Sequence, residues 1–310
     1  MTEQSGNMRE LLDAVQNDPD AIDLEVAEEL LEAEGASGRT TALQAISVIA
    51  KEEPDRVLEY TDRVVELLDD DVLSVRTTAA LALTSLSRNR PEAVVPAVPA
   101  LVGILGEEPP LFRFRAAGAL APLTADHATA FVDHTDHLLE VLLDGPTFEE
   151  DPRSVATSEE LSSEEKQRTL STLAGRSGEW KRARTRSNAT REVAANVLVE
   201  VARVDPDQIA SRLDRVLETL SADEAAVRGA GVEMVRHVGE DDPDAVEDAI
   251  DPLLALLDDV AFVRARAIRA LGYAEATAAI DPLREVATAD ENDDVADLAA
   301  DTADWLDENS

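Results

Sequence analysis

Three Asp-His pairs lie close together in residues 126–137, DHATAFVDHTDH, and come nearest to a metal-binding pattern in this chain. Asp133, His134 and His137 are spaced to approach one another across a helical turn, and imidazole with carboxylate suits zinc or iron. His137, however, falls at the start of a predicted helix, where an equivalent stretch of the chain carries Asp251 and polar residues are ordinary. We therefore expect no metal site.

No other motif predicts catalysis. The absence of cysteine excludes disulfides, thiolate nucleophiles and Cys-ligated zinc or iron–sulfur clusters. The sequence has no HExxH motif, glycine-rich phosphate loop or nucleophile elbow, and the GRSG of Gly175–Gly178 has the wrong spacing. Pairs of carboxylates do not indicate a catalytic site here, because such pairs are expected by chance among 66 acidic residues. The sequence thus predicts a protein that is not an enzyme and uses no cofactor.

A basic segment interrupts the acidic chain between Lys166 and Arg191. It holds eight basic residues and one acidic residue, Glu179, so its net charge is +7; the whole chain carries −38, which leaves −45 for the rest. Long insertions in regular scaffolds are frequently functional. We predict that this segment binds a partner through Trp180, Lys181, Arg182, Arg184 and Arg186. The alternative is an internal latch, in which the same arginines fold back onto the chain's own acidic surface.

An acidic protein is the expected partner, which would make the chain a protein–protein interaction scaffold or adaptor. Nucleic acid is the alternative, because arginines beside a tryptophan can contact phosphate while a base stacks on the ring. If five phosphates are neutralised, the logarithm of the binding constant falls with the logarithm of the salt concentration with a slope of about −4.5. Raising the salt from ~0.15 M to ~2 M would then lower the affinity by about five decades. The negative charge of the remaining chain would also repel a duplex.

The charge balance also indicates an environment. Of the 28 basic residues, only Lys51, Lys166 and Lys181 are lysines. Repulsion among so many carboxylates is screened at high salt, so we expect a protein from a salt-accumulating cytoplasm such as that of a haloarchaeon. An acidic protein with a basic partner is the alternative. The N-terminus has no signal-peptide pattern and no stretch approaches the ~18 apolar residues of a membrane span, so we expect a cytoplasmic protein without membrane contact.

The elements that must position these residues repeat along the chain. An acidic turn is followed by an arginine that opens an apolar, alanine-rich helix, and then by a second apolar helix. Successive arginines are separated by 37, 39, 76, 37 and 36 residues, and 76 is twice 38. A fixed period in the high thirties, with two helices per period, is typical of a solenoid. The arginines are Arg39, Arg76, Arg115, Arg191, Arg228 and Arg264.

The clearest copy is Pro252–Gly272, PLLALLDDVAFVRARAIRALG. Its LLDD turn, followed by Val-Arg and an alanine-rich helix, resembles the HEAT repeat family, including phycobilisome-lyase-like relatives with shorter units, and the resemblance covers residues 38–145 and 188–306. It implies an all-α fold, an α-solenoid or superhelix of about six to seven HEAT-like helix-pair repeats. HEAT-type deoxyhypusine hydroxylases hold iron with His-Glu dipeptides, and this chain has none.

The resemblance also implies a structural role for the repeated arginines. In the HEAT family, the turn aspartate and the helix-opening arginine form a ladder between neighbouring repeats. The implied pairs are Asp69 or Asp70 with Arg76, and Asp258 or Asp259 with Arg264. The implied ladder arginines are Arg76, Arg115, Arg191, Arg228 and Arg264.

Four regions follow from this pattern. We expect N-terminal capping helices in residues 1–37, HEAT-like repeats in 38–145, an inserted polar and basic segment in 146–187, and further repeats with a C-terminal cap in 188–310.

The insertion is inferred from a long connection between repeats. Leu143 and Thr190 are 47 residues apart, whereas the equivalent Leu68 and Val75 are 7 apart. The additional residues amount to one repeat length, so a degenerate repeat is the alternative, although the segment has few periodic apolar residues. We expect one polar helix near Ser162–Ala174 and then a mobile stretch containing glycine and serine.

Overall fold

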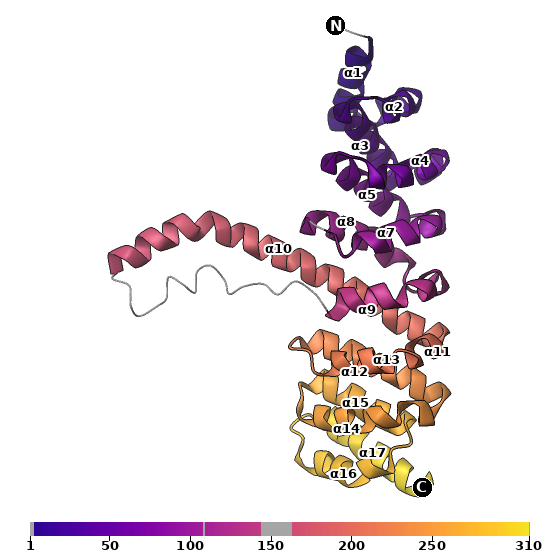
Figure 1. Cartoon of the computed structure of the whole chain (residues 1–310), viewed down its shortest axis with the longest axis vertical. Coiled ribbons are helices and arrows are strands. Elements are labelled where there is room, and N and C mark those ends of the chain that lie inside the picture. Colours follow the sequence, from indigo (N-terminus) through magenta and orange to yellow (C-terminus); the bar gives the residue numbers. More distant parts are fainter. Residues whose placement is uncertain (1–2, 108, 144–162, 310) are drawn as a thin grey trace. The chain divides into compact units, whose positions relative to one another are not determined.

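The computed structural model describes residues 3–107, 109–143 and 163–309, and their side chains in the ranges 6–107, 109–143 and 178–309. Within these ranges every regular element is a helix, and short helices pair with longer ones in succession along the chain (Figure 1). The predicted all-α solenoid is therefore confirmed. No helix in the described part of the chain has the length and apolar character needed to cross a membrane.

The chain forms two compact units. Unit 1 comprises Met1–Leu123 and Asp144–Val193, and unit 2 comprises Thr124–Leu143 and Ala194–Ser310. These units are defined by contacts within the fold, whereas the four regions expected from the sequence are defined by the repeat pattern. The four regions therefore stay a prediction.

Unit 1 is built on three consecutive long helices, α3, α5 and α8, of which α5 packs against both others. The side chains on their contact faces are aliphatic or small. Leu43, Leu83 and Ala116, for example, are at most 1% exposed. Small residues suit helices that stack closely. The elements of this unit are α1 (Glu3–Asn17), η1 (Pro19–Ala21), α2 (Leu24–Leu31), α3 (Ala36–Glu52), η2 (Pro54–Tyr60), α4 (Thr61–Glu66), η3 (Leu67–Asp69), α5 (Leu73–Ser87), α6 (Pro91–Val94), η4 (Val95–Ala97), α7 (Val98–Ile104), α8 (Pro110–Leu120) and η5 (Ala121–Leu123), where η marks a 3₁₀ helix.

Unit 2 stacks α13 on α15 and α15 on α17 in the same way. Val263 of α15 is fully buried, and α17 buries Val295, Ala299 and Ala303. The elements are η6 (Ala128–His134), α9 (Thr135–Leu143), α11 (Pro206–Ala210), α12 (Leu213–Leu220), α13 (Ala225–Asp241), η8 (Pro243–Ala249), α14 (Ile250–Ala255), η9 (Leu256–Asp258), α15 (Ala261–Tyr273), η10 (Thr277–Ala279), α16 (Ile280–Ala289) and α17 (Asp293–Asn309).

The second helix of each repeat is broken into short pieces. The stretch between α3 and α5, for example, is a 3₁₀ helix, a single short α-helix and another 3₁₀ turn. Prolines such as Pro54 and Pro96 lie at the first or second position of these pieces, where a missing N–H leaves no hydrogen bond unmade. The periodic apolar pattern alone predicts one continuous helix here.

Helix α10 (Ser163–Val204) corrects the expectation for the inserted segment (Figure 1). It runs without a break through the stretch after Ala174, for which the sequence predicts a mobile segment. It then continues into the next repeat. No proline occurs between Pro152 and Pro206. Gly175 and Gly178 each disfavour a helix by only about 1 kcal/mol, and the surrounding Arg, Lys, Glu and Ala residues favour it. The buried face that starts at Ser187 anchors the helix, so the helical conformation extends backward from it.

Candidate functional site

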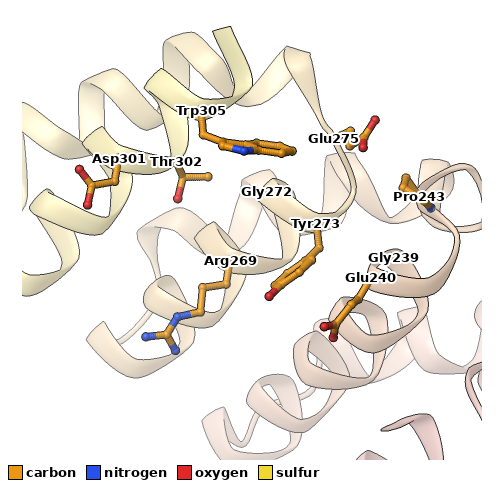
Figure 2. Close-up of a pocket in the computed structure, with 10 residues that line it drawn as sticks. All are labelled: Gly239, Glu240, Pro243, Arg269, Gly272, Tyr273, Glu275, Asp301, Thr302 and Trp305. Atoms are coloured by element: carbon orange, nitrogen blue, oxygen red, sulfur yellow. The ribbon is translucent and has the colours of Figure 1, made fainter. Parts of the chain in front are cut away.

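A concave site of about 600 Å³ lies between α13, α15 and α17 of unit 2 (Figure 2). Its aromatic side chains, Tyr273 and Trp305, are 43% and 45% exposed, in a chain with only 3% aromatic residues. Glu240 and Asp301 also line it, so aromatic faces and carboxylates face the same space. Arg236 already lies over the Tyr273 ring, with 5.6 Å between its Cζ and the ring centroid. No motif in the sequence connects these residues, because they come from three different helices.

Glu275, which also lines this pocket, has an unusual backbone conformation. Its φ is +48°, the one positive value among the described non-glycine residues. The N–H of Ala276 donates to Leu271 O and that of Glu275 to Gly272 O, each at 3.1 Å, which is the Schellman arrangement that ends a helix. Glycine is the usual residue at this place. Glu275 therefore occupies a left-handed conformation that costs a non-glycine residue about 1–2 kcal/mol.

The histidines do not form a metal site in the part of the chain that the structure describes. No group of three His, Cys, Asp or Glu residues there is arranged to hold an ion. His137 Nδ1 instead lies 3.4 Å from Glu140, one turn further along α9. His237 is enclosed on α13, where burial and then the neighbouring Arg236 lower its pKa. His237 is therefore neutral at pH 7, and its enclosed position is typical of a residue that contributes to packing.

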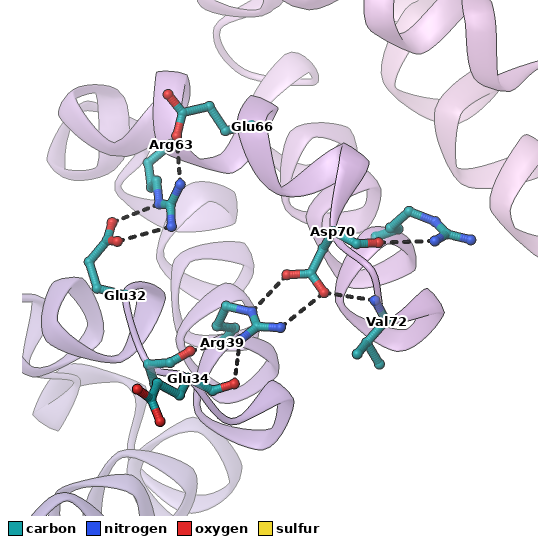
Figure 3. Close-up of polar contacts among 9 residues, drawn as sticks. Glu32, Glu34, Arg39, Arg63, Glu66, Asp70 and Val72 are labelled. Carbon is teal, nitrogen blue, oxygen red and sulfur yellow. Dashed lines mark hydrogen bonds and ion pairs between the residues drawn. The ribbon is translucent and has the colours of Figure 1, made fainter.

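Arg39 shows how neighbouring repeats are joined (Figure 3). Its Nε lies 2.7 Å from one Asp70 carboxylate oxygen and its Nη2 donates to the other at 3.0 Å. Its Nη1 donates to the carbonyl oxygens of Ala33 and Glu34, just before α3. Asp70 also accepts the main-chain N–H of Val72 at 2.8 Å. The guanidinium thus joins the turn before its own helix to the turn before the next one.

The same arrangement occurs twice in unit 2. Arg228 contacts both carboxylate oxygens of Asp259, at 2.5 and 2.7 Å, and Arg264 contacts both of Asp290, each at 2.7 Å. Arg264 also donates to the main-chain oxygen of Asp259 at 2.6 Å. Each of these arginines therefore pairs with the aspartate of the following turn.

The pairs implied by the family resemblance are shifted by one repeat. Asp70 receives Arg39 instead of Arg76, which donates to the Asp70 main-chain oxygen at 2.9 Å. Asp259 likewise receives Arg228 instead of Arg264. Asp69 and Asp258 are exposed and form no ion pair with the described residues. An arginine side chain is long enough to cross to the neighbouring repeat, and the sequence spacing does not distinguish the two partners.

These contacts stabilise the ionised carboxylates. Hydrogen bonds from Arg228 and Arg264 lower the pKa of Asp259 and Asp290, respectively. Burial opposes ionisation of Asp70, but the hydrogen bonds from Arg39 and from the Val72 N–H outweigh it, and the pKa of Asp70 is lowered as well. The side chains of these aspartates are 5–9% exposed, so the pairs are only weakly screened by solvent.

Arg115 departs from this arrangement. Its Nε is enclosed, yet the described part of the chain gives that atom neither a hydrogen bond nor an ion pair. Asp70 and Asp259 stand two positions after a leucine pair, and Gly145 stands at the equivalent position after Leu142 and Leu143. Burial, and then the charges of Arg186 and Arg88, lower the pKa of Arg115. Arg115 thus lies near two further cations, and no carboxylate of the described residues forms an ion pair with it. We call Arg88, Arg115 and Arg186 the arginine cluster.

Arg76 also lacks a carboxylate, but it has another partner. Its guanidinium carbon lies 5.5 Å from the centroid of the Phe112 ring. Stacking on an aromatic face suits a planar guanidinium. The remaining ladder candidate, Arg191, is half-buried on α10.

The partner-binding candidates lie together on the exposed part of α10. Lys181, Arg182 and Arg184 are exposed, and Arg186 is half-buried. Arg184 lies over the Trp180 ring at 5.3 Å from its centroid, one helical turn away. Among the described residues, none of the four cations forms an ion pair. An internal latch requires such ion pairs, and the described part of the chain does not show them. Lys166, Arg168 and Arg176 belong to the residues whose side chains lie outside the described set.

No protein-family model matches the chain, and no curated protein matches its sequence. Solved structures do match. An archaeal HEAT-like repeats protein from Thermococcus onnurineus NA1 is 14% identical, with a TM-score of 0.56 over 93% of this chain and 98% of that one. A designed armadillo repeat protein is 16% identical (TM-score 0.53; 81% and 100%), and an engineered protein is 18% identical (TM-score 0.54; 81% and 97%). At these identities the likeness shows the fold alone, a helical-repeat solenoid of the HEAT and armadillo type.

Proposed function

We propose that this protein is a non-enzymatic interaction scaffold whose basic α10 surface binds an acidic protein. We define the basic α10 surface as Trp180, Lys181, Arg182, Arg184 and Arg186. One observation carries the proposal: four cations in a chain of 66 acidic residues lie together without an ion pair to any described residue. Surface charges of one sign attract a partner of the other sign and set its orientation. The same observation favours partner binding over the internal latch.

The helical-repeat architecture supports this role. Solenoids present extended surfaces on stacked helices, and insertions between repeats carry binding residues. In this chain the basic surface lies on a helix that continues into the repeat stack, so a rigid element positions it.

Nucleic acid is the less favoured partner. A phosphate backbone would have to be held at several positions, and such binding weakens steeply with salt. Arg184 also covers one of the two faces of the Trp180 ring, which leaves one face for a base to stack on. We further propose a salt-rich cytoplasm as the setting, supported by the net charge of −38 and by three lysines among 28 basic residues.

Affinity co-purification from the native host, at its own salt and after nuclease treatment, tests this function. The comparison is between the parent protein and a variant with Arg182, Arg184 and Arg186 replaced by serine. A matched control replaces Arg9, Arg56 and Arg203, which are exposed and lie outside the basic α10 surface, and so removes the same charge. We expect an acidic protein to bind the parent and the control and to be lost with the α10 variant. Equal capture by all three would move the binding surface elsewhere and contradict the proposal.

A further inference from the structure

We infer that the arginine cluster of Arg88, Arg115 and Arg186 binds a carboxylate side chain of the partner's acidic segment. The partner would supply, from another chain, the contact that an aspartate of the next turn supplies to Arg39, Arg228 and Arg264. This inference rests on the proposed function, because it assigns a specific role to a surface already proposed to bind an acidic protein.

One arginine–carboxylate geometry recurs in three repeats. Arg39, Arg228 and Arg264 each direct a guanidinium fork at both oxygens of a carboxylate, at 2.5–3.0 Å. Arg115 occupies the same place in its repeat, but its enclosed Nε has no acceptor among the described residues. A buried donor without an acceptor is unfavourable, and the planar fork matches a carboxylate. Arg115 thus supplies the hydrogen-bond donors of an arginine–carboxylate pair that recurs in this fold, but the carboxylate is not among the described residues.

The arginine cluster also brings like charges near one another. Arg186 and Arg88 are close enough to Arg115 to lower its pKa, in addition to the effect of burial. Cations in a partly enclosed site repel one another more strongly than in water. A bound carboxylate offsets this repulsion and supplies an acceptor for the Arg115 Nε–H. No carboxylate of the described residues does so.

Hydrogen bonds between helices hold α8 against α5 and α10. Thr84 Oγ1 of α5 donates to the Arg115 main-chain oxygen at 3.0 Å, which fixes α8 against α5. Arg113 of α8 donates to Ser187 Oγ of α10 at 3.4 Å, and both side chains are at least nine-tenths buried. Since Ser187 follows Arg186, this contact holds Arg186 beside α8. A site placed on three packed helices is ordered before its ligand arrives.

An NMR titration of the full chain tests the inference. The probe is an acetylated, amidated hexa-aspartate peptide in 1–2 M KCl, and hexa-asparagine is the uncharged control. The signals of the arginine Nε–H groups are followed and are assigned with single Arg→Lys variants. We expect the Arg115 and Arg182 signals to shift in parallel with peptide concentration. Arg115→Lys keeps the charge but loses the fork, and should weaken binding roughly tenfold. A lysine variant at Arg9, far from α10 in the sequence, should not.

The outcomes separate this inference from the function on which it rests. A peptide that shifts Arg182 but leaves Arg115 unmoved would overturn the inference and retain the basic α10 surface as the binding surface. A peptide that shifts neither would overturn both. Potassium phosphate that shifts Arg115 as strongly as the peptide, at equal charge, would show a general anion site and overturn the assignment to a carboxylate.

Discussion

Two arginines at equivalent places in the repeats should differ in how the same substitution changes the stability of the fold. Arg228 has a complete set of acceptors, whereas Arg115 has an enclosed Nε without one. Methionine keeps an unbranched apolar stem but removes the charge and all donors. We therefore expect Arg228→Met to destabilise the folded protein and Arg115→Met to leave it unchanged or to stabilise it.

The magnitudes follow from the contacts. Arg228 makes two hydrogen bonds to Asp259 and two to main-chain oxygens, and the two side chains are 17% and 9% exposed. Breaking a buried pair costs about 3–5 kcal/mol, and partial exposure places this one near 3 kcal/mol. Arg115→Met removes an uncompensated cation next to two others, so its effect should lie between zero and a gain of about 1 kcal/mol.

Urea unfolding in 2 M KCl, followed by circular dichroism, measures both effects. Urea is preferable to guanidinium chloride, which changes the ionic strength and competes with arginine for carboxylates. With a typical urea slope of about 1–3 kcal/mol per molar, Arg228→Met should lower the midpoint of the unit 2 transition by roughly 1–3 M. An Arg115→Met variant as unstable as Arg228→Met would show that Arg115 has an internal counter-ion, and the argument from the arginine cluster would fail.

Four further predictions test other parts of the structure. Val263→Asp places a charge at a fully buried position and should destabilise unit 2 by more than about 4 kcal/mol; a thermal melt like that of the parent would show that the repeat register is wrong. Glu275→Gly should stabilise the helix end by about 1 kcal/mol, seen as a higher urea midpoint, because glycine accepts positive φ without strain. Because the pKa of Asp259 is lower in the folded state than its unfolded value of about 3.9, its stabilising effect is present above that value and is lost as the pH falls through the folded pKa. The difference in urea midpoint between parent and Arg228→Met should therefore shrink below about pH 4, and a constant difference would contradict this. Below roughly 0.5 M KCl we expect loss of helical circular dichroism through carboxylate repulsion, and a fully folded protein in dilute buffer would count against the salt-rich setting.

The sequence was sufficient to predict the repeats because their signal is local and periodic. The spacing of the repeated arginines and the apolar positions around them predict helix pairs. Val263, which precedes one of these arginines, is fully buried. The same local pattern does not reveal where a helix breaks. The second helices are divided at proline-containing turns, and α10 continues through two glycines because its neighbouring repeat anchors it.

The candidate site was predictable only in part. The basic residues of α10 are adjacent in the sequence, so their charge was visible without a structure. Arg88 was not recognised, because the packing of α5 and α8 brings it to Arg115 from another helix. The pocket beside Tyr273 and Trp305 was missed for the same reason. Contacts between repeats depend on how far a side chain extends towards the neighbouring repeat. The spacing of residues along the sequence does not give this information.

Site-specific photocrosslinking in the native host, at its own salt, tests whether the basic α10 surface binds an acidic protein. Benzoylphenylalanine replaces Thr185, an exposed neutral residue of α10 that leaves every cation of the basic α10 surface intact. The control position is Ala100, exposed on α7. We expect Thr185→benzoylphenylalanine to capture an acidic protein that Ala100→benzoylphenylalanine does not. Capture of the same protein only from Ala100 would place the binding surface on the repeats and contradict the role proposed for α10.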